Sequence, residues 1–307
     1  MAGQGFNRRG FIARASAALW AAPIKGARAA PRYGTLARRE SQYATTYVDQ
    51  DGDYLTMRFG VNRCLFTESR YNPNDTAELP VIYTQFMTVA LAYAANPKRV
   101  VEIGLGGGRV ASYVHDFVPD ANVTCVELDP GVIELARKYF GVTPDPRLEL
   151  VVADGRIYMA RQSENFDIIL VDAYQGTLVP FHLVTSEFFS ILKRRLTPGG
   201  VIAQNIAPKV LDLNRMVATA RANFDHVDLY PAGNNWVLIA YDGNAKSDAN
   251  LSTRAQALQQ QHALRYPLWP MLAKRRADMA ATAKPFIDDF APVGYRAYDS
   301  RCRAGGT

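Results

Sequence analysis

The sequence predicts an α/β fold, in which a mostly parallel sheet carries helices on both faces and a small β-hairpin domain precedes it. Three observations support this prediction. From residue 98 onward, short apolar strands alternate with segments of helical periodicity. A glycine-rich turn joins the first of those strands to the first helix. Before residue 80, the chain has short runs rich in Tyr, Thr and Val, separated by turn residues.

Residues 1–30 have the three parts of an export signal in order. Paired arginines, Arg8-Arg9, are followed by an alanine-rich stretch and then by Ala27-Arg28-Ala29, which fits a small-residue cleavage site. Paired arginines before Gly-Phe-Ile are typical of twin-arginine signals, which export folded proteins in bacteria. We therefore expect a signal peptide over residues 1–30 and an exported, periplasmic protein. The alternatives are a frayed basic N-terminus or an amphipathic helix, and the protein would then be cytoplasmic.

The distribution of charge argues against a nucleic-acid partner. The whole chain carries a net charge of +6, but residues 1–30 hold five basic residues and no acid, which leaves +1 for the remainder. A folded part this close to neutral lacks the basic footprint of a DNA- or RNA-binding surface. No apolar run reaches the roughly 18 residues of a spanning helix, so we also expect no membrane span.

The chain has three cysteines, and no pair of them has the spacing of metal ligands, so we expect no metal site. Cys125 lies in a run typical of a buried strand, where a cysteine acts as a small core residue. The sequence leaves open whether Cys64 and Cys302 form a disulfide.

Residues 31–80 are expected to form the small β domain. Strands are predicted at 44–48 and 54–59, and Asp51-Gly52 between them is a hairpin signal. A third short strand is predicted at 63–67, after which the chain enters a loop rich in Asn and Pro.

Residues 81–307 are expected to form the larger, nucleotide-binding domain. The predicted strands lie at residues 99–103, 122–128, 148–152, 166–171 and 201–205, with a closing antiparallel hairpin at 226–230 and 236–241. The predicted helices lie at residues 83–93, 110–117, 130–140 and 185–196. Strands that alternate with helices indicate a parallel sheet covered on both faces. The charged run Lys274-Arg275-Arg276 is interpreted as a solvated helix face.

A nucleotide site is predicted where the strand at 99–103 ends in Gly104-Leu105-Gly106-Gly107-Gly108. Glycines there let a ligand approach the backbone closely between strand and helix. Glu127 ends the second strand, where an acid can accept hydrogen bonds from both ribose hydroxyls. A dinucleotide dehydrogenase is not favoured, because the turn is not G-x-G-x-x-G and no second nucleotide-binding half follows.

Two more acids follow strand ends. Asp154-Gly155 follows the third strand, and Asp172 follows the fourth. Ligands of open parallel sheets bind outside the carboxyl ends of the strands, so Glu127, Asp154 and Asp172 are expected to converge on one crevice.

These motifs together resemble the spermidine synthase family. The resemblance rests on Glu102–Gly108, Val126-Glu127-Leu128-Asp129, Val152-Ala153-Asp154-Gly155, Asp167–Asp172 and Tyr83-Thr84-Gln85-Phe86-Met87. It implies a class I methyltransferase-like, Rossmann-like fold of the type that binds S-adenosylmethionine (SAM). It also implies transfer of an aminopropyl group from decarboxylated SAM to an amine such as putrescine, with no tightly bound cofactor and a possible homodimer.

The resemblance also implies roles for single residues. Glu127 would hold the ribose and Asp154 the adenine amino group, while Asp172 would orient and deprotonate the attacking amine, and Tyr83 would line the site. The nucleotide would be held by Gly104, Gly106, Gly107, Gly108, Arg109, Glu127, Asp154 and Gly155. Tyr174 and Gln175 are candidates for contacts to the acceptor, and His182 is either such a contact or a structural loop residue.

Three departures from the family pattern bear on the substrate. Arg109 stands where the family has an aspartate that grips the donor's amine, and an arginine could instead pair with the carboxylate of SAM. Asp172-Ala173-Tyr174-Gln175 replaces the family's Asp-Ser-x-Asp, and the glutamine expected after the hairpins is replaced near Glu68-Ser69. The open alternatives are therefore a SAM-dependent methyltransferase of the same fold and a non-catalytic exported protein that binds a nucleotide or polyamine.

Overall fold

The computed structural model describes Met1 and residues 32–61, 64–176 and 179–289, and the described chain from Arg32 onward forms one compact unit. The predicted signal at residues 1–30 lies outside these ranges, except for Met1. Cys302, which the sequence left as a possible disulfide partner of Cys64, also lies outside them. Within the described ranges, no helix is both long enough and apolar enough to cross a bilayer.

The N-terminal part is a four-stranded antiparallel sheet in the order β1-β2-β3-β4. Its strands are β1 (Arg32–Glu40), β2 (Thr45–Gly52), β3 (Tyr54–Val61) and β4 (Cys64–Tyr71). The hairpin between β2 and β3 turns at Gly52, whose φ of 63° suits glycine. The strand β1 was not predicted, because its arginine-rich sequence lacks the apolar alternation of a strand.

The main sheet has seven strands in the order β10-β11-β9-β8-β5-β6-β7. They are β5 (Arg99–Ile103), β6 (Asn122–Glu127), β7 (Leu148–Val152), β8 (Phe166–Val171), β9 (Leu196–Ile206), β10 (His226–Ala232) and β11 (Asn235–Tyr241). The five strands from β9 to β7 are parallel, and β10 and β11 close the sheet as an antiparallel hairpin. The predicted α/β class, with its N-terminal hairpin sheet, is confirmed.

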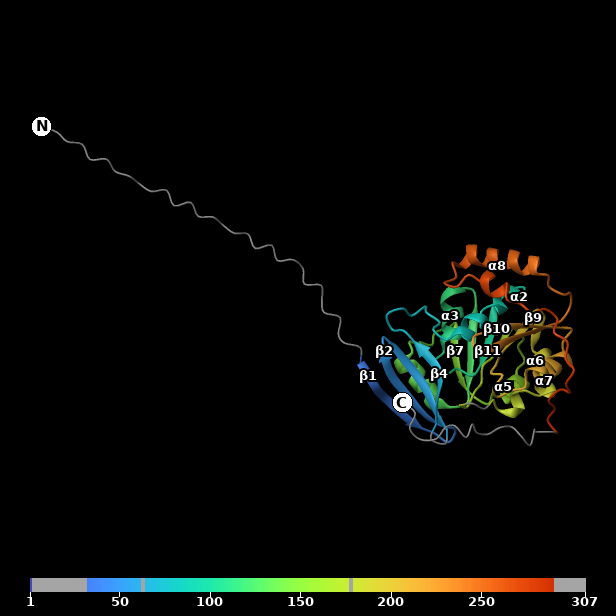
Figure 1. The fold of residues 1–307 in the computed structure, drawn as a ribbon, viewed down its shortest axis with the longest axis horizontal. Coiled ribbons are helices and arrows are strands. Elements are labelled where there is room, and N and C mark those ends of the chain that lie inside the picture. The colour runs from blue at the N-terminus through green and yellow to red at the C-terminus, as the bar shows by residue number, and fades with distance from the viewer. Residues whose placement is uncertain (2–31, 62–63, 177–178, 290–307) are drawn as a thin grey trace. The chain divides into compact units, whose positions relative to one another are not determined.

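Both faces of the main sheet are covered, since alternate residues of its strands enter different cores. In β8, Ile168 and Leu170 belong to one core and Ile169 and Val171 to the other. One group of helices, seen together in Figure 1, contributes to the second core: α5 (Gly155–Arg161), α6 (Ser186–Arg194) and α7 (Leu213–Arg221). The first core takes residues from α1 (Ile82–Met87), α2 (Ala90–Tyr93), α3 (Arg109–Phe117), α4 (Pro130–Tyr139), α8 (Asp248–His262) and α9 (Trp269–Leu272).

Two predicted helices differ from the structure. The helix expected over 83–93 is broken into α1 and α2, where the Thr88 hydroxyl donates to the carbonyl of Gln85 at 2.7 Å. The helix expected over 185–196 ends at Arg194, because β9 begins at Leu196. The helices α5, α7, α8 and α9 were not predicted.

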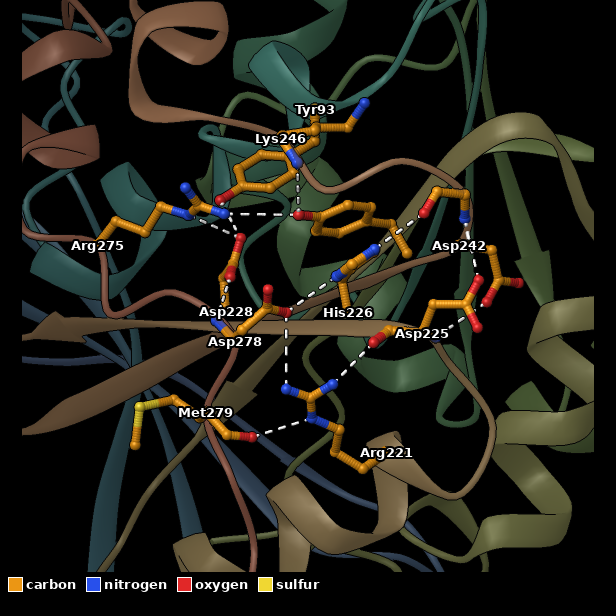
Figure 2. A network of polar contacts seen from close by, with 12 residues as sticks. Tyr93, Arg221, Asp225, His226, Asp228, Asp242, Lys246, Arg275, Asp278 and Met279 are labelled. Atoms are coloured by element: carbon orange, nitrogen blue, oxygen red, sulfur yellow. Dashed lines mark hydrogen bonds and ion pairs between the residues drawn. The ribbon is translucent and has the colours of Figure 1, made fainter.

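The charged run at residues 274–276 is not a helix face. Figure 2 shows the Arg275 side chain reaching Asp228, and both are buried, with side chains 5% and 0% exposed. Arg276 pairs instead with Leu229 of β10 through two backbone hydrogen bonds, of 2.8 and 2.9 Å. The segment after α9 is therefore held on the sheet by a buried ion pair and backbone bonds.

Candidate functional site

The site lies where the strand order reverses, between β5 and β8. The chain leaves β5 at Gly104 and β8 at Asp172, and the amide of Asp172 donates to the carbonyl of Ile103 at 2.8 Å. A Cβ placed on Gly104, whose φ is 90°, would lie 2.4 Å from the carbonyl oxygen of Asp172. Only glycine permits this close approach of the two strand ends, which opens the crevice typical of such switch points.

A cavity opens at this switch point, between the carboxyl ends of β5 to β8 and the end of β4. Five acids line it: Glu68, Glu127, Asp129, Asp154 and Asp172. No lysine or arginine belongs to its lining, as far as the described residues go. The cavity is therefore suited to a cationic ligand.

The glycine-rich turn contributes in two ways. Gly104 and Gly106 line the cavity, whereas Gly107 and Gly108 shape the turn behind it. The amide of Gly107 donates to the Ser69 hydroxyl at 2.9 Å. Gly108 begins α3 with a φ of 63°, and a Cβ there would lie 2.6 Å from Val142. These glycines hold the turn against its neighbours and leave its first half open to a ligand.

The side chain of Glu127, the last residue of β6, links the end of β6 to the glycine-rich turn. Its Oε2 accepts from the amide of Leu105 and its Oε1 from the amide of Asp129, both at 2.9 Å. Burial raises the pKa of this carboxyl, and the backbone donors oppose that rise. The carboxylate is held rigidly at the cavity wall, and each oxygen keeps a second lone pair for a ligand hydroxyl.

Asp154 is the N-cap of α5 and contacts His182, which also lines the cavity. Its Oδ1 accepts from the amide of Ile157 at 2.9 Å, and its Oδ2 lies 2.8 Å from Nε2 of His182. A Cβ on Gly155 would lie 2.3 Å from the side chain of Ile103, so this glycine is needed for close packing of α5. The structure thus pairs His182 with Asp154.

Asp172 is held by two side chains. Asn205 donates from Nδ2 to its Oδ1 at 2.8 Å, and the Tyr83 hydroxyl also hydrogen-bonds to it. Burial raises the pKa of Asp172 to about 6, although both hydrogen bonds act to lower it. A carboxyl with a pKa in this range can accept a proton near neutral pH.

Tyr174 and Gln175 line the cavity beside Asp172, but their polar groups also make contacts within the protein. The Tyr174 hydroxyl donates to the carbonyl of Asn205 at 2.9 Å and accepts from the amide of Ala207 at 3.0 Å. Gln175 donates from Nε2 to the carbonyl of Tyr43, which follows β1. Both residues therefore brace the loop after β8 as well as line the cavity.

Arg109 does not reach the cavity, contrary to its expected place in the nucleotide site. Its buried guanidinium donates to the carbonyls of Phe140 and Thr76 and lies over the ring of Tyr71, 4.6 Å from the ring centre. Arg109 is the first residue of α3, and its side chain contacts the end of β4, the loop at Thr76 and the C-terminal end of α4. It is not placed to pair with a ligand carboxylate in this cavity.

The predicted site residues did not include Glu68, Ser69, Asp129 or Asn205. Asn205 was predicted to end a strand of the same sheet, so the rule that identified the acids would have found it had it been applied to amides. Glu68 and Ser69 lie in the N-terminal sheet. Their only signal in the sequence was the family resemblance, in which a glutamine is expected near these two positions. Metal ligands are not gathered here: the described chain has no cluster of three or more His, Cys, Asp or Glu residues that could hold an ion.

The chain is similar to known polyamine aminopropyltransferases in sequence. Residues 81–232 match the spermine/spermidine synthase domain. A polyamine aminopropyltransferase of Vibrio vulnificus is 29% identical over 265 residues, which cover 83% of this chain and 89% of that one.

Two solved structures share the fold. A probable spermidine synthase from Corynebacterium glutamicum superposes with a TM-score of 0.66 at 22% identity, over 82% of this chain and 96% of that one. Human methyltransferase-like protein 13, solved in complex with SAH, superposes with a TM-score of 0.55 at 28% identity, over 61% of this chain and 93% of that one. The fold of this chain is thus shared by a probable spermidine synthase and by a methyltransferase-like protein.

Proposed function

We propose that this protein, a transferase that carries the spermine/spermidine synthase domain, moves an aminopropyl group from decarboxylated SAM to an amine such as putrescine. The observation that supports this proposal best is the charge of the cavity. Five carboxyl groups line it, and its described lining has no lysine or arginine. The donor carries a sulfonium and an ammonium and the acceptor is a protonated amine, so every charge brought by the substrates is positive.

The nucleotide would lie across the glycine-rich turn. Glu127, at the end of β6, is placed to accept the ribose hydroxyls, and Asp154, at the end of β7, to accept the adenine amino group. Gly104 and Gly106 leave room for the nucleotide against the backbone. With this order of groups along neighbouring strand ends, the sulfur would lie near Asp172, at the switch point.

Asp172 would act as the base. A protonated amine cannot attack, so the carboxylate first binds the ammonium of the acceptor and takes one proton from it. The freed nitrogen lone pair then attacks the aminopropyl carbon that is bonded to the sulfonium. The bond between this carbon and the sulfur breaks, and its electron pair stays on the sulfur, which becomes a neutral thioether. The products are the extended amine and methylthioadenosine. Because the sulfonium is already a good leaving group, positioning supplies much of the rate.

A SAM-dependent methyltransferase is the second candidate, since the groups proposed to hold the nucleotide would serve SAM equally well. SAM carries a carboxylate that decarboxylated SAM lacks, and that carboxylate would meet an acidic cavity. Arg109, which could have paired with it, is turned toward Phe140 and Thr76. The charges of the site therefore favour the decarboxylated donor.

The test is to titrate the purified full chain calorimetrically with decarboxylated SAM and SAM, and to assay release of methylthioadenosine with putrescine present. Aminopropyl transfer requires tighter binding of decarboxylated SAM and amine-dependent release of methylthioadenosine. Tighter binding of SAM, with methyl transfer to an amine, would replace the proposal by the second candidate.

Export is proposed separately, on the sequence of residues 1–30. If the paired arginines direct export, the periplasmic protein begins near Ala30, and changing Arg8-Arg9 to lysines keeps the full-length protein in the cytoplasm. The measurement is the intact mass of protein recovered from each compartment, and an uncleaved cytoplasmic protein before any change would contradict export.

A further inference from the structure

We propose that Glu68 binds the primary ammonium of the donor's aminopropyl chain, and that this contact makes the site select decarboxylated SAM over SAM. The inference rests on the proposed function and adds a specificity-determining residue to it. Arg109, which follows the glycine-rich turn, faces away from the cavity, and Glu68 is the acid that the N-terminal sheet brings into the lining.

The backbone of β4 aims Glu68 into the cavity. Ser69 pairs with Met57 of β3, and Thr67 pairs with the next residue, Arg58, so Glu68 is an extra residue in the ladder. Such a bulge turns a side chain away from the regular alternation and occurs often beside active sites. Consecutive residues of a regular strand point to opposite faces, yet Glu68 and Ser69 both line the cavity.

The position of the bulge places Glu68 on the donor side of the cavity. The neighbouring Ser69 accepts a hydrogen bond from the amide of Gly107, which fixes this end of β4 on the glycine-rich turn. Glu68 interacts electrostatically with both Glu127 and Asp172. A chain that leaves the ribose at Glu127 and reacts beside Asp172 passes within reach of this carboxyl group.

The carboxyl group of Glu68 is incompletely satisfied. The amide of Gly176 donates to it, but its Oε1 is buried and has no hydrogen-bond partner among the described residues. Burial and the charges of Asp172 and Glu127 raise the pKa of Glu68 well above its usual range. A buried acceptor without a partner costs free energy, and an ammonium donor from the ligand would remove that cost.

The same carboxylate would discriminate between donors. SAM carries its carboxylate on the chain that bears the amine, and this second charge would be brought close to Glu68 and Asp172. Like charges brought together in a partly buried site repel strongly. Decarboxylated SAM presents only the ammonium to Glu68, so its binding is favoured.

The test compares full-length wild type with Glu68→Gln by calorimetric titration with decarboxylated SAM, SAM and methylthioadenosine. Glutamine keeps the shape of the side chain and its acceptor for Gly176 but removes the charge. We expect decarboxylated SAM to bind at least about tenfold more weakly, the magnitude of a lost charged hydrogen bond. Methylthioadenosine has no ammonium, so its affinity should stay within about twofold, which also shows that the variant is folded.

Glu102→Gln is the matched control. Glu102 of β5 is a buried carboxyl, 2% exposed, that interacts with Asp172 but does not line the cavity. Its change should leave the ratio of the two affinities, for decarboxylated SAM and for methylthioadenosine, as in the wild type. If the ratio fell similarly in Glu102→Gln, the loss of any negative charge near Asp172 would explain the weaker binding. The proposed role of Glu68 would then be overturned.

Failure of the inference and failure of the proposed function give different results. A wild type that binds SAM as tightly as decarboxylated SAM overturns the proposed function. A wild type that prefers decarboxylated SAM, with a Glu68→Gln variant that keeps the same preference, overturns the inference alone. An equal loss of affinity for decarboxylated SAM and methylthioadenosine would also overturn it, because Glu68 would then support the whole nucleotide.

Discussion

Asn205 donates a hydrogen bond from Nδ2 to Oδ1 of Asp172, with 2.8 Å between the two atoms. The strand register sets this contact, because Val171, the last residue of β8, lies opposite Gln204 of β9. Asp172 and Asn205 are the next residues along the chain. Asn235, the first residue of β11, donates in turn to Oδ1 of Asn205 at 2.8 Å. Two amides in series therefore orient the carboxyl group proposed as the base.

Replacing Asn205 by alanine should lower kcat and also change its pH dependence. The hydrogen bond from Asn205 holds the pKa of Asp172 down, so its loss should move the acidic limb of kcat/KM to higher pH. The measurement is a pH–rate profile of aminopropyl transfer. Asn235→Ala, which removes only the second amide, should cause a smaller shift in the same direction. A variant with lower activity but an unshifted limb would show that Asn205 is merely structural.

Asp172→Asn should reduce turnover by about 10²–10⁴-fold, the usual contribution of a positioned base. The affinity for methylthioadenosine should change little, because the groups proposed to hold the nucleotide are untouched. Single-turnover kinetics beside calorimetric titration would separate the two effects. Activity equal to the wild type would remove Asp172 from the mechanism.

The wild-type enzyme should lose activity in mild acid. Burial raises the pKa of Asp172 to about 6, and the base works only when ionised, so kcat/KM should fall as pH drops through about 6. Below that value the ionised fraction falls tenfold for each pH unit. Initial rates between pH 5 and 8, in buffers of constant ionic strength, would measure this limb. A plot of log kcat/KM against pH should have a slope of about one there, as expected for one ionisable group. A profile that stays flat down to pH 5 would contradict an Asp172 base with this pKa.

Asp228→Asn should destabilise the fold strongly. Asp228 is fully buried and accepts from Nε of Arg275 at 2.8 Å and from the Tyr93 hydroxyl at 2.7 Å (Figure 2). The change would remove the buried carboxylate and leave the guanidinium paired only with the exposed Asp248. Breaking a buried ion pair by removing one partner costs about 3–5 kcal/mol in measured cases.

Urea unfolding would measure this loss of stability. The matched control is Asp248→Asn, because Asp248 pairs with the same arginine at 2.8 Å but its side chain is 85% exposed. An exposed pair contributes only about 0–1 kcal/mol. Equal losses in the two variants would show that burial of Asp228 is not the cause.

His226 should add stability in mild acid that disappears at higher pH. Burial alone would lower its pKa, but Asp278 at 3.0 Å and the carbonyl of Gly243 at 2.9 Å outweigh burial and raise it (Figure 2). Because the pKa of His226 is higher in the folded protein than in the unfolded chain, protonation of His226 stabilises the fold. This contribution is fully present below the pKa of the unfolded chain, about 6.5, and it is lost as the pH rises through the pKa of the folded protein.

The test is the stability difference between wild type and His226→Gln, measured by urea unfolding at pH 5.5 and pH 8.5. The wild type should exceed the variant by more at pH 5.5. A difference that is the same at both values would contradict a charged His226–Asp278 pair.

The order of strands and helices in the main sheet could be predicted, because each depends on a local pattern. Apolar runs such as Phe166–Val171 mark strands buried on both faces, and Asp129-Pro130 marks the start of a helix. The boundaries of α6 and the break between α1 and α2 were missed, because strand pairing and a side-chain bond to the backbone decide them. The polar, arginine-rich β1 was missed because pairing with β2 holds it.

The sequence by itself determined the edge of the sheet at which the ligand would bind and the type of acid found there. A glycine turn after a strand and acids at successive strand ends are local features, and parallel strands bring their carboxyl ends to one edge. Only the tertiary structure decided that Arg109 turns away, that Glu68 and Asn205 join the site, that His182 meets Asp154 and that Arg275 is buried. The physical reason is that each of these side chains is positioned by contacts with segments distant along the chain, which no local pattern encodes.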